Sequence, residues 1–398
     1  MNSFIEIKII GLLVLLILAL VVAVSAKYFR LPYVVSLVLV GLSLGAFSKN
    51  LPIKLEYDYV TLFCLPALIF DAAWNMKITD FFKNIRPIIA LAFLGVFITL
   101  IFSVFILYFC AKTALEVALL FGAIIAATDP IAVLALFKKT AINPNVITVL
   151  EGESLFNDGI SVVVYSVILS AILNNRFHDF NFLNLAINFT AVILGGVAIG
   201  FSVGYLATRL KILLNDHLLA ITMSIVLAYG SFVIADLLKV STIIASIVAC
   251  LTFANFGGKK NMSLRTQAGI DGFWELAAFL VNSLLFLLIG FQINVQLLPM
   301  HAKPIIFGIL AILLARLVLV YALDFIYQAK QNKLSLSEKH LIFWAALRGG
   351  LSMVLALNIP VTFTYRREII LITYGVVLFS LLAPGLSMKA LVKKLNLI

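Results

Sequence analysis

The stretch of the chain that decides the fold runs from Pro87 to Ala111 and reads PIIALAFLGVFITLIFSVFILYFCA. It contains no charged residue and exceeds the roughly 20 residues with which a helix crosses a hydrocarbon core about 30 Å thick. Similar runs recur along the chain, which is 63% hydrophobic and only 12% charged. Soluble domains are about 25% charged, and a transmembrane barrel would need alternating strands that are weak here. The sequence therefore predicts an all-α polytopic membrane protein.

The apolar runs, separated by charge, Pro, Gly and Asn, predict about thirteen transmembrane helices. The first run ends in Val24-Ser25-Ala26, which resembles a signal-peptide cleavage site. Glu6 and Lys8 leave the preceding segment without net positive charge, so we favour a retained first span. The predicted spans are residues 7–26, 31–49, 57–75, 87–111, 114–138, 145–173, 182–210, 217–236, 240–257, 272–295, 302–328, 338–360 and 368–391.

Lys and Arg are distributed unevenly over the predicted loops. The loops after odd-numbered spans, together with the C-terminus, hold roughly twice as many as the other loops, and cytoplasmic loops carry such an excess. We therefore expect the N-terminus outside and the C-terminus in the cytoplasm, in the cell inner membrane. Because topology explains the net charge of +11, we expect contact with the lipid bilayer and no nucleic-acid partner.

The predicted spans divide into two inverted six-helix repeats joined by a linker helix. The first repeat covers residues 1–181, the linker 182–213 and the second repeat 214–398. The fifth span is interrupted at Thr128-Asp129-Pro130, and its counterpart in the second repeat, the twelfth, at Arg348-Gly349-Gly350. Transporters commonly bind ions where such discontinuous crossing helices meet at mid-membrane.

Seven charged residues that we expect within the hydrocarbon region are the candidate functional residues, because each such charge costs several kcal/mol in lipid. The five acids exceed the two bases, so a cation or a proton can fill the surplus negative charge. Arg348 adjoins the interrupted helix, and we predict a gate-side pair between it and Glu151. The full set is Asp71, Asp129, Glu151, Glu153, Asp158, Arg316 and Arg348.

The sixth predicted span separates two kinds of acid. Glu151, Ser154 and Asp158 follow i, i+3, i+7 spacing, whereas Glu153 points roughly 140° away from Asp158. We expect Asp158 and Ser154 to face an ion site and Glu153 to face a supporting helix. A buried carboxylate needs a partner, so we predict a structural ion pair between Glu153 and Arg316. The alternative is that Glu153 is an exposed acid near a helix end.

The break in the fifth span offers backbone ligands. Pro130 lacks an N–H and disfavours helix at Asp129, so the carbonyls around Thr128 are partly freed to bind Na⁺. Asp129 can offset the positive end of the half-helix in the twelfth span, or it can simply cap a Pro kink. Asp71 lies deep in the third apolar run, although a charge at the membrane edge is the alternative.

Cofactor chemistry has little support in the sequence. The three cysteines lie within apolar runs, and the four histidines lie in or beside loops without metal-ligand spacing. We therefore expect no cofactor, only transported Na⁺ and H⁺. A pH-sensing role for one histidine stays an alternative.

Several motifs together carry a family resemblance. The segments Phe121–Ala135, Glu151–Gly159, Asp271–Glu275, Ala315-Arg316 and Ala346–Gly350 resemble the signature segments of the cation/proton antiporter family that includes NhaP-type transporters and sodium/hydrogen exchangers. The resemblance covers essentially the whole chain. It implies a homodimer with a six-helix ion-transport core and an interface domain, moving by elevator-like alternating access.

The resemblance also implies roles for individual residues. Asp158 is then the essential ion and proton carboxylate, and Ser154, Asp71 and the backbone of Thr128 complete the cation site. Glu153 with Arg316 would brace this site. Some relatives have Glu where this chain has Asp71. Asn157 and Asp129 belong to the same set of ion-handling residues.

Other functions remain as alternatives. A cation channel would need a pore-lining selectivity element, and a membrane enzyme a nucleophile, base or metal constellation; neither pattern is present. Electrogenic antiporters with two adjacent aspartates are the nearest alternative, but Asn157 occupies the first of those positions. We therefore predict electroneutral exchange of one Na⁺ for one H⁺, with Li⁺ or K⁺ as alternative cations.

Overall fold

The computed structural model describes residues 2–29, 31–47, 60–137, 140, 142–174, 182–210, 216–259, 262–326 and 334–395. Every regular element within these ranges is helical. They include nine helices long and apolar enough to cross a membrane and four shorter apolar helices of 10–17 residues. The prediction of an all-helical polytopic membrane protein is confirmed. The predicted domain boundary after residue 213 lies outside the described residues, as does residue 181.

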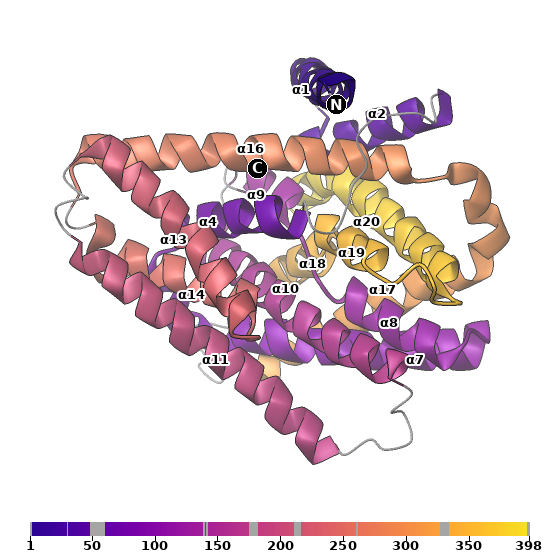
Figure 1. The fold of residues 1–398 in the computed structure, drawn as a ribbon. Helices are drawn as coiled ribbons and strands as arrows, with labels where there is room; N and C mark the ends of the chain where they lie inside the picture. The colour runs from indigo at the N-terminus through magenta and orange to yellow at the C-terminus, as the bar shows by residue number, and fades with distance from the viewer. Residues whose placement is uncertain are drawn as a thin grey trace.

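The helices are named in chain order (Figure 1). In the first half they are α1 (Asn2–Phe29), α2 (Tyr33–Phe47), α4 (Leu65–Asn75), α5 (Ile78–Lys83), α6 (Ile85–Ile89), α7 (Gly95–Val104), α8 (Leu115–Ile125), α9 (Ile131–Phe137) and α10 (Pro144–Leu173). In the second half they are α11 (Phe182–Arg209), α13 (His217–Leu237), α14 (Thr242–Phe253), α16 (Leu264–Gln292), α17 (Ala302–Ile326), α18 (Leu336–Ala345), α19 (Gly350–Leu357) and α20 (Arg366–Lys394).

Local sequence sets several helix ends. Ser335 and Glu338 form a reciprocal capping box at the start of α18. Asp216 caps α13: its carboxylate accepts hydrogen bonds from the backbone N–H groups of Leu219 and Leu218, and these bonds lower the pKa of the carboxyl group. The predicted tenth span begins earlier than expected, because a serine cap extends α16 back to Leu264.

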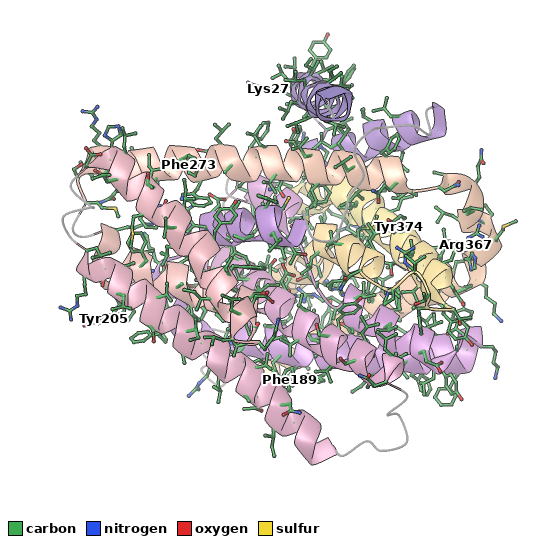
Figure 2. The ribbon with its side chains drawn as sticks, viewed as in Figure 1. Lys27, Phe189, Tyr205, Phe273, Arg367 and Tyr374 are labelled. Atoms are coloured by element: carbon green, nitrogen blue, oxygen red, sulfur yellow. The ribbon has the colours of Figure 1, made fainter. Side chains whose placement is uncertain are left out.

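Close helix packing depends on small residues. Gly196, Gly200 and Gly204 lie along α11, and a Cβ atom at any of them would collide with a backbone carbonyl of α14 or of its N-cap residue, Ser241. Gly41 and Gly290 bring α2 and α16 together in the same way. The opposite side of α11 exposes large apolar side chains, and Figure 2 shows Tyr205 on the outer side of this helix. Such a surface belongs in lipid.

Two helices are interrupted and meet at their breaks. α8 ends at Ile125 and α9 begins at Ile131, while α18 ends at Ala345 and α19 begins at Gly350. The Asp129 N–H donates to the Leu347 carbonyl at 2.9 Å, so the two extended segments are hydrogen-bonded to each other. The interruptions lie where the sequence places Pro130 and the Gly349-Gly350 pair.

Candidate functional site

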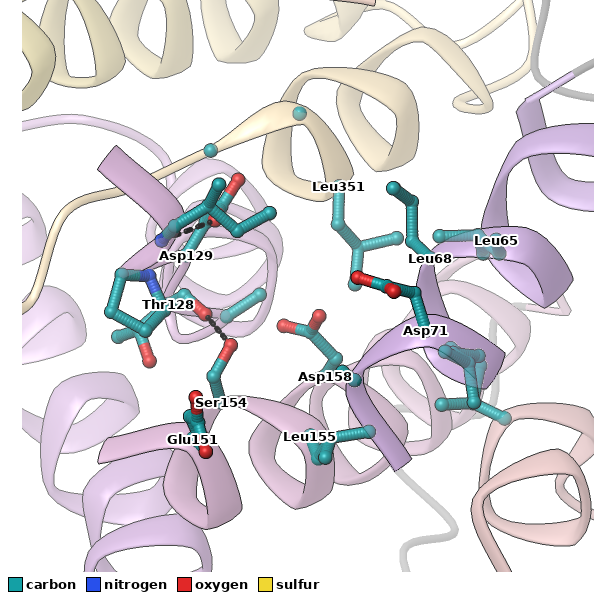
Figure 3. A pocket seen from close by; sticks show the side chains of 18 of the residues that line it. Leu65, Leu68, Asp71, Thr128, Asp129, Glu151, Ser154, Leu155, Asp158 and Leu351 are labelled. Carbon is teal, nitrogen blue, oxygen red and sulfur yellow. Dashed lines mark hydrogen bonds between the residues drawn. The ribbon is translucent and has the colours of Figure 1, made fainter. Parts of the chain in front are cut away.

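A cavity of about 330 Å³ lies where the two interrupted helices meet α4 and α10 (Figure 3). Its wall combines apolar side chains with carboxylates, hydroxyls, an amide and backbone freed from helical bonding. Its polar lining includes Asp71, Asn75, Thr128, Asp129, Glu151, Ser154, Asp158 and Ser352. The structure therefore brings together residues of three separate sequence segments that were predicted to form the site, and it adds Ser352 from a fourth.

Helix α10 presents Glu151, Ser154 and Asp158 to this cavity and turns Glu153 away from it. Glu153, 2% exposed, forms a two-pronged ion pair with Arg316 of α17, and the second contact, Nη2 to Oε2, is 2.9 Å. Arg316 also donates to the Ile342 carbonyl, 3.0 Å from Nη2. The 3.6-residue period of the helix thus separates a cavity face from a bracing face.

Ser154 and Asn157 tie α10 to the break after α8. The Ser154 hydroxyl donates to the Thr128 carbonyl at 2.7 Å. The Asn157 side chain donates to the Thr128 hydroxyl and accepts from the Thr128 N–H at 3.4 Å. Asn157 is 2% exposed and is absent from the cavity lining. Asn157 thus hydrogen-bonds the segment of the break and does not line the cavity; its predicted part in ion handling stays a prediction.

Asp129 serves both breaks. Its carboxylate accepts from the Ile131 N–H at 3.1 Å, at the start of α9. The same side chain lies against Gly349, just before the first residue of α19. A negative charge is favourable at a helix N-terminus. The sequence offered two interpretations of Asp129, a cap on the Pro kink and a counter-charge for the half-helix of the twelfth span. In the structure one side chain lies at both helix starts, so the two interpretations do not exclude each other.

Arg348 lies at the crossing, 2% exposed. Its guanidinium group donates to the carbonyls of Ala126 and Ala127, at 2.9 and 3.2 Å. Interrupting a helix leaves such carbonyls without their usual donors. Arg348 supplies donors to these two carbonyls, and the pair of Arg348 with Glu151 stays a prediction. Glu151 lines the cavity one turn before Ser154.

Asp71 approaches from α4, on the other side of the cavity. Figure 3 shows its carboxylate and that of Asp158 projecting into the same space from different helices. Asn75, one turn later, donates to the Asp71 carbonyl at 2.9 Å and to its carboxylate at 3.4 Å. Asp71 is therefore part of the cavity wall.

Two serines that the sequence analysis did not single out support the crossing. Ser352 donates to the Ile124 carbonyl at 2.9 Å, near the end of α8. The Ser380 hydroxyl accepts from the Arg348 N–H at 3.0 Å. Serines are common in apolar helices, so their type alone gave no signal; only proximity to the broken segments in three dimensions identifies them.

The ligands available in the cavity are carboxylate, hydroxyl and carbonyl oxygens, the donors that hard cations prefer. Among the described residues, no group of three or more His, Cys, Asp or Glu side chains could hold a resident metal ion. A lipid-embedded helical protein with partly buried carboxylates at two crossed, interrupted helices is a secondary ion transporter in its architecture.

The chain belongs to the sodium/hydrogen exchanger family. The family profile described as "Sodium/hydrogen exchanger, transmembrane" matches residues 13–394. The Na⁺/H⁺ antiporter ApNhaP of Aphanothece halophytica is 37% identical over 382 residues, covering 94% of this chain and 72% of that protein. The Na⁺/H⁺ antiporter NhaH of Halobacillus dabanensis is 35% identical, covering 98% of both chains.

The fold is shared with a solved structure. The sodium proton antiporter MjNhaP1 from Methanocaldococcus jannaschii, solved at pH 8, superposes with a TM-score of 0.81. The match covers 98% of this chain and 99% of that one, at 23% sequence identity. The likeness shows that the two chains share one architecture.

Proposed function

We propose that this protein is a secondary active antiporter that exchanges Na⁺, or a similar small monovalent cation, for H⁺, and that both ions compete for Asp158. The observation that carries the proposal is the placement of Asp158 in one cavity with Ser154, Asp71 and the Thr128 segment. The relatives at 35% and 37% identity are themselves named Na⁺/H⁺ antiporters, which supports the same activity.

Competition follows from the chemistry of a carboxylate enclosed among helices. An isolated negative charge is costly there, so Asp158 needs either a proton on its oxygen or a cation beside it. The two neutralise the same charge and exclude each other. Ser154 and the freed carbonyl of Thr128 would supply neutral ligands to the cation, and Asp71 a second carboxylate. A low pH would block the site with protons, and a high pH would leave too few to exchange.

One residue bears on the stoichiometry. The position before Asp158 is Asn157, which is engaged with Thr128 and has no proton to exchange. With a single titrating carboxylate, each cycle exchanges one H⁺ for one Na⁺ and moves no net charge. The membrane potential, worth about 2.3 kcal/mol per charge at 100 mV, would then not drive transport. Asp71 shares the cavity, and its titration would make the exchange electrogenic.

The proposed organisation follows the sequence. Nine long and four shorter apolar helices in the described ranges are compatible with about thirteen spans in two inverted repeats, residues 1–181 and 214–398, around a linker at 182–213. The interrupted helices occupy corresponding places in the two repeats. We also assign a homodimer in the cell inner membrane, with the N-terminus outside and the C-terminus in the cytoplasm.

The decisive experiment reconstitutes the protein in proteoliposomes and follows a pH dye while Na⁺, Li⁺ or K⁺ is added. Asp158→Asn should be inactive at every pH while accumulating normally, and the unaltered protein should show a bell-shaped pH profile. A K⁺/valinomycin potential should leave the initial rate unchanged. Acceleration by the potential would identify a second titrating acid, and exchange by Asp158→Asn would overturn the assignment of the carboxylate.

A further inference from the structure

A polar network outside the cavity joins the C-terminal end of α4 to the segments that follow α14. The Lys259 ammonium group donates to the Trp74 carbonyl and lies 4.4 Å from the centre of the Trp74 ring. The Trp74 indole N–H donates to the Asp271 carboxylate on α16 at 2.5 Å. Trp74 is fully buried. Trp74 is therefore held at its backbone by the positive charge of Lys259 and at its side chain by the negative charge of Asp271.

The chain beyond Trp74 is attached to the same region. Asn255 donates to the Met76 carbonyl at 3.3 Å and accepts from the Ile78 N–H at 3.1 Å. Gln267 in turn donates to the Lys259 carbonyl at 2.7 Å, which fixes the backbone that carries the lysine. These bonds tie the end of α4 to a framework formed by residues far away in the sequence.

The Trp74 carbonyl belongs to the last turn of α4, where carbonyls lack intrahelical donors and a cation is favourable. The ammonium group is partly enclosed: burial lowers the pKa of Lys259, the Asp271 carboxylate opposes this shift, and Lys77 adds to it. A charge-assisted hydrogen bond in such surroundings is stronger than one in water. Lys259 thus acts as an electrostatic cap on α4.

The helix that Lys259 caps carries Asp71 one turn before Trp74. An α-helix rises 1.5 Å and turns 100° per residue. A small shift of α4 along its axis, or a small rotation about it, therefore moves the Asp71 carboxylate relative to Asp158 across the cavity. The Trp74 ring also packs against Phe253 of α14, with ring centres 5.9 Å apart, so both contacts restrict rotation. The aromatic packing and the polar bonds act on the same turn.

We propose that Lys259, together with Asp271, is a positioning residue for cation binding: it fixes the depth and rotation of α4 and thereby the distance of Asp71 from Asp158. This inference rests on the proposed function, because it takes Asp71 to be a wall of the cation site. Lys259 does not touch the cavity and acts only through α4.

The test measures the initial rate of exchange against Na⁺ concentration in proteoliposomes for the full chain. Lys259→Met should raise the KM for Na⁺ by about 2- to 30-fold, the usual range for residues that act through one another, with a smaller effect on kcat. Lys259→Arg, which keeps the charge and the donors, should restore the KM. Lys389→Met, at an exposed lysine of α20, is the matched control and should behave as the unaltered protein.

A double-mutant cycle separates positioning from general stability. In an Asp71→Asn background, Lys259→Met should cause no further increase in the KM for Na⁺. If the Asp71→Asn protein does not transport, cation binding is measured instead as the rise in Tm of the purified protein on addition of Na⁺. If Lys259→Met does not accumulate, Lys259→Gln is used in its place, because glutamine keeps a hydrogen-bond donor without the charge. An unchanged KM in these variants, or an equal increase with and without Asp71, would overturn the positioning role. Exchange by Asp158→Asn would instead refute the proposed function, so the two failures are distinguishable.

Discussion

Gly349→Ala is the substitution that tests the crossing of the two breaks most directly. Gly349 has φ −123° and ψ −156°, an extended conformation that alanine adopts freely, so the backbone itself does not oppose the change. A Cβ atom there would lie 2.8 Å from Cγ of Asp129 and closer still to its Cβ and Oδ2. Non-bonded carbon atoms prefer about 3.5–4.0 Å. Asp129 or Gly349 must therefore move by at least about 0.7 Å.

The movement affects the site because Asp129 is hydrogen-bonded to the other break and is joined directly to Thr128, which lines the cavity. Its N–H bond to the Leu347 carbonyl holds the breaks together, and the preceding residue, Thr128, contributes the carbonyl that Ser154 binds. Overpacking of this kind costs about 1–3 kcal/mol, and a displacement near 1 Å at a reacting site costs about 100-fold in rate. We expect Gly349→Ala to lower the Tm and to reduce the exchange rate by at least about tenfold.

The assay compares the Tm in detergent and the Na⁺/H⁺ exchange rate in proteoliposomes for Gly349→Ala and a control. Gly230→Ala on α13 is the control, because a Cβ atom there meets nothing within 4 Å. Alanine in that helix should keep or slightly raise stability, by up to about 1 kcal/mol. If Gly349→Ala matched Gly230→Ala in both measurements, the close crossing of the breaks would not support the site.

Three further predictions concern other parts of the molecule. Glu153→Ala or Arg316→Ala should lower the amount of folded protein, at a cost of about 3–5 kcal/mol, because one buried charge loses its partner; normal accumulation with only a changed cation affinity would contradict the bracing role. Ser154→Ala should accumulate normally but raise the KM for Na⁺, since a ligand and the bond to Thr128 are lost; an unchanged KM would remove Ser154 from the site. A periplasmic reporter fused after Ile398 should stay inactive, and activity there would reverse the predicted topology.

The directions in which the acids on α10 point could be predicted, because the spacing of residues in a helix fixes the face on which each lies. The separation of Glu153 from Asp158 follows from 3.6 residues per turn, and the structure places them on opposite faces. Arg316 was foreseen as the partner because it is the strong base inside the eleventh predicted span. The hydrogen bonds of Arg348 to the carbonyls of Ala126 and Ala127 could not be predicted in the same way. Every residue has a backbone carbonyl, so the residue types in the sequence do not indicate which carbonyls accept.

The sequence by itself determined that the chain enters lipid as helices, because long uncharged runs cannot be hydrated and must satisfy their backbone internally. It also located the breaks at Pro130 and Gly349-Gly350, where proline lacks a donor and glycine permits close approach. Only the tertiary structure decided that Asp71 faces Asp158 across one cavity, that Asn157 hydrogen-bonds Thr128, and that Lys259 donates to the last turn of the helix bearing Asp71. These contacts join residues far apart in the chain, and helix packing, which depends on the shapes of many side chains together, sets which faces meet.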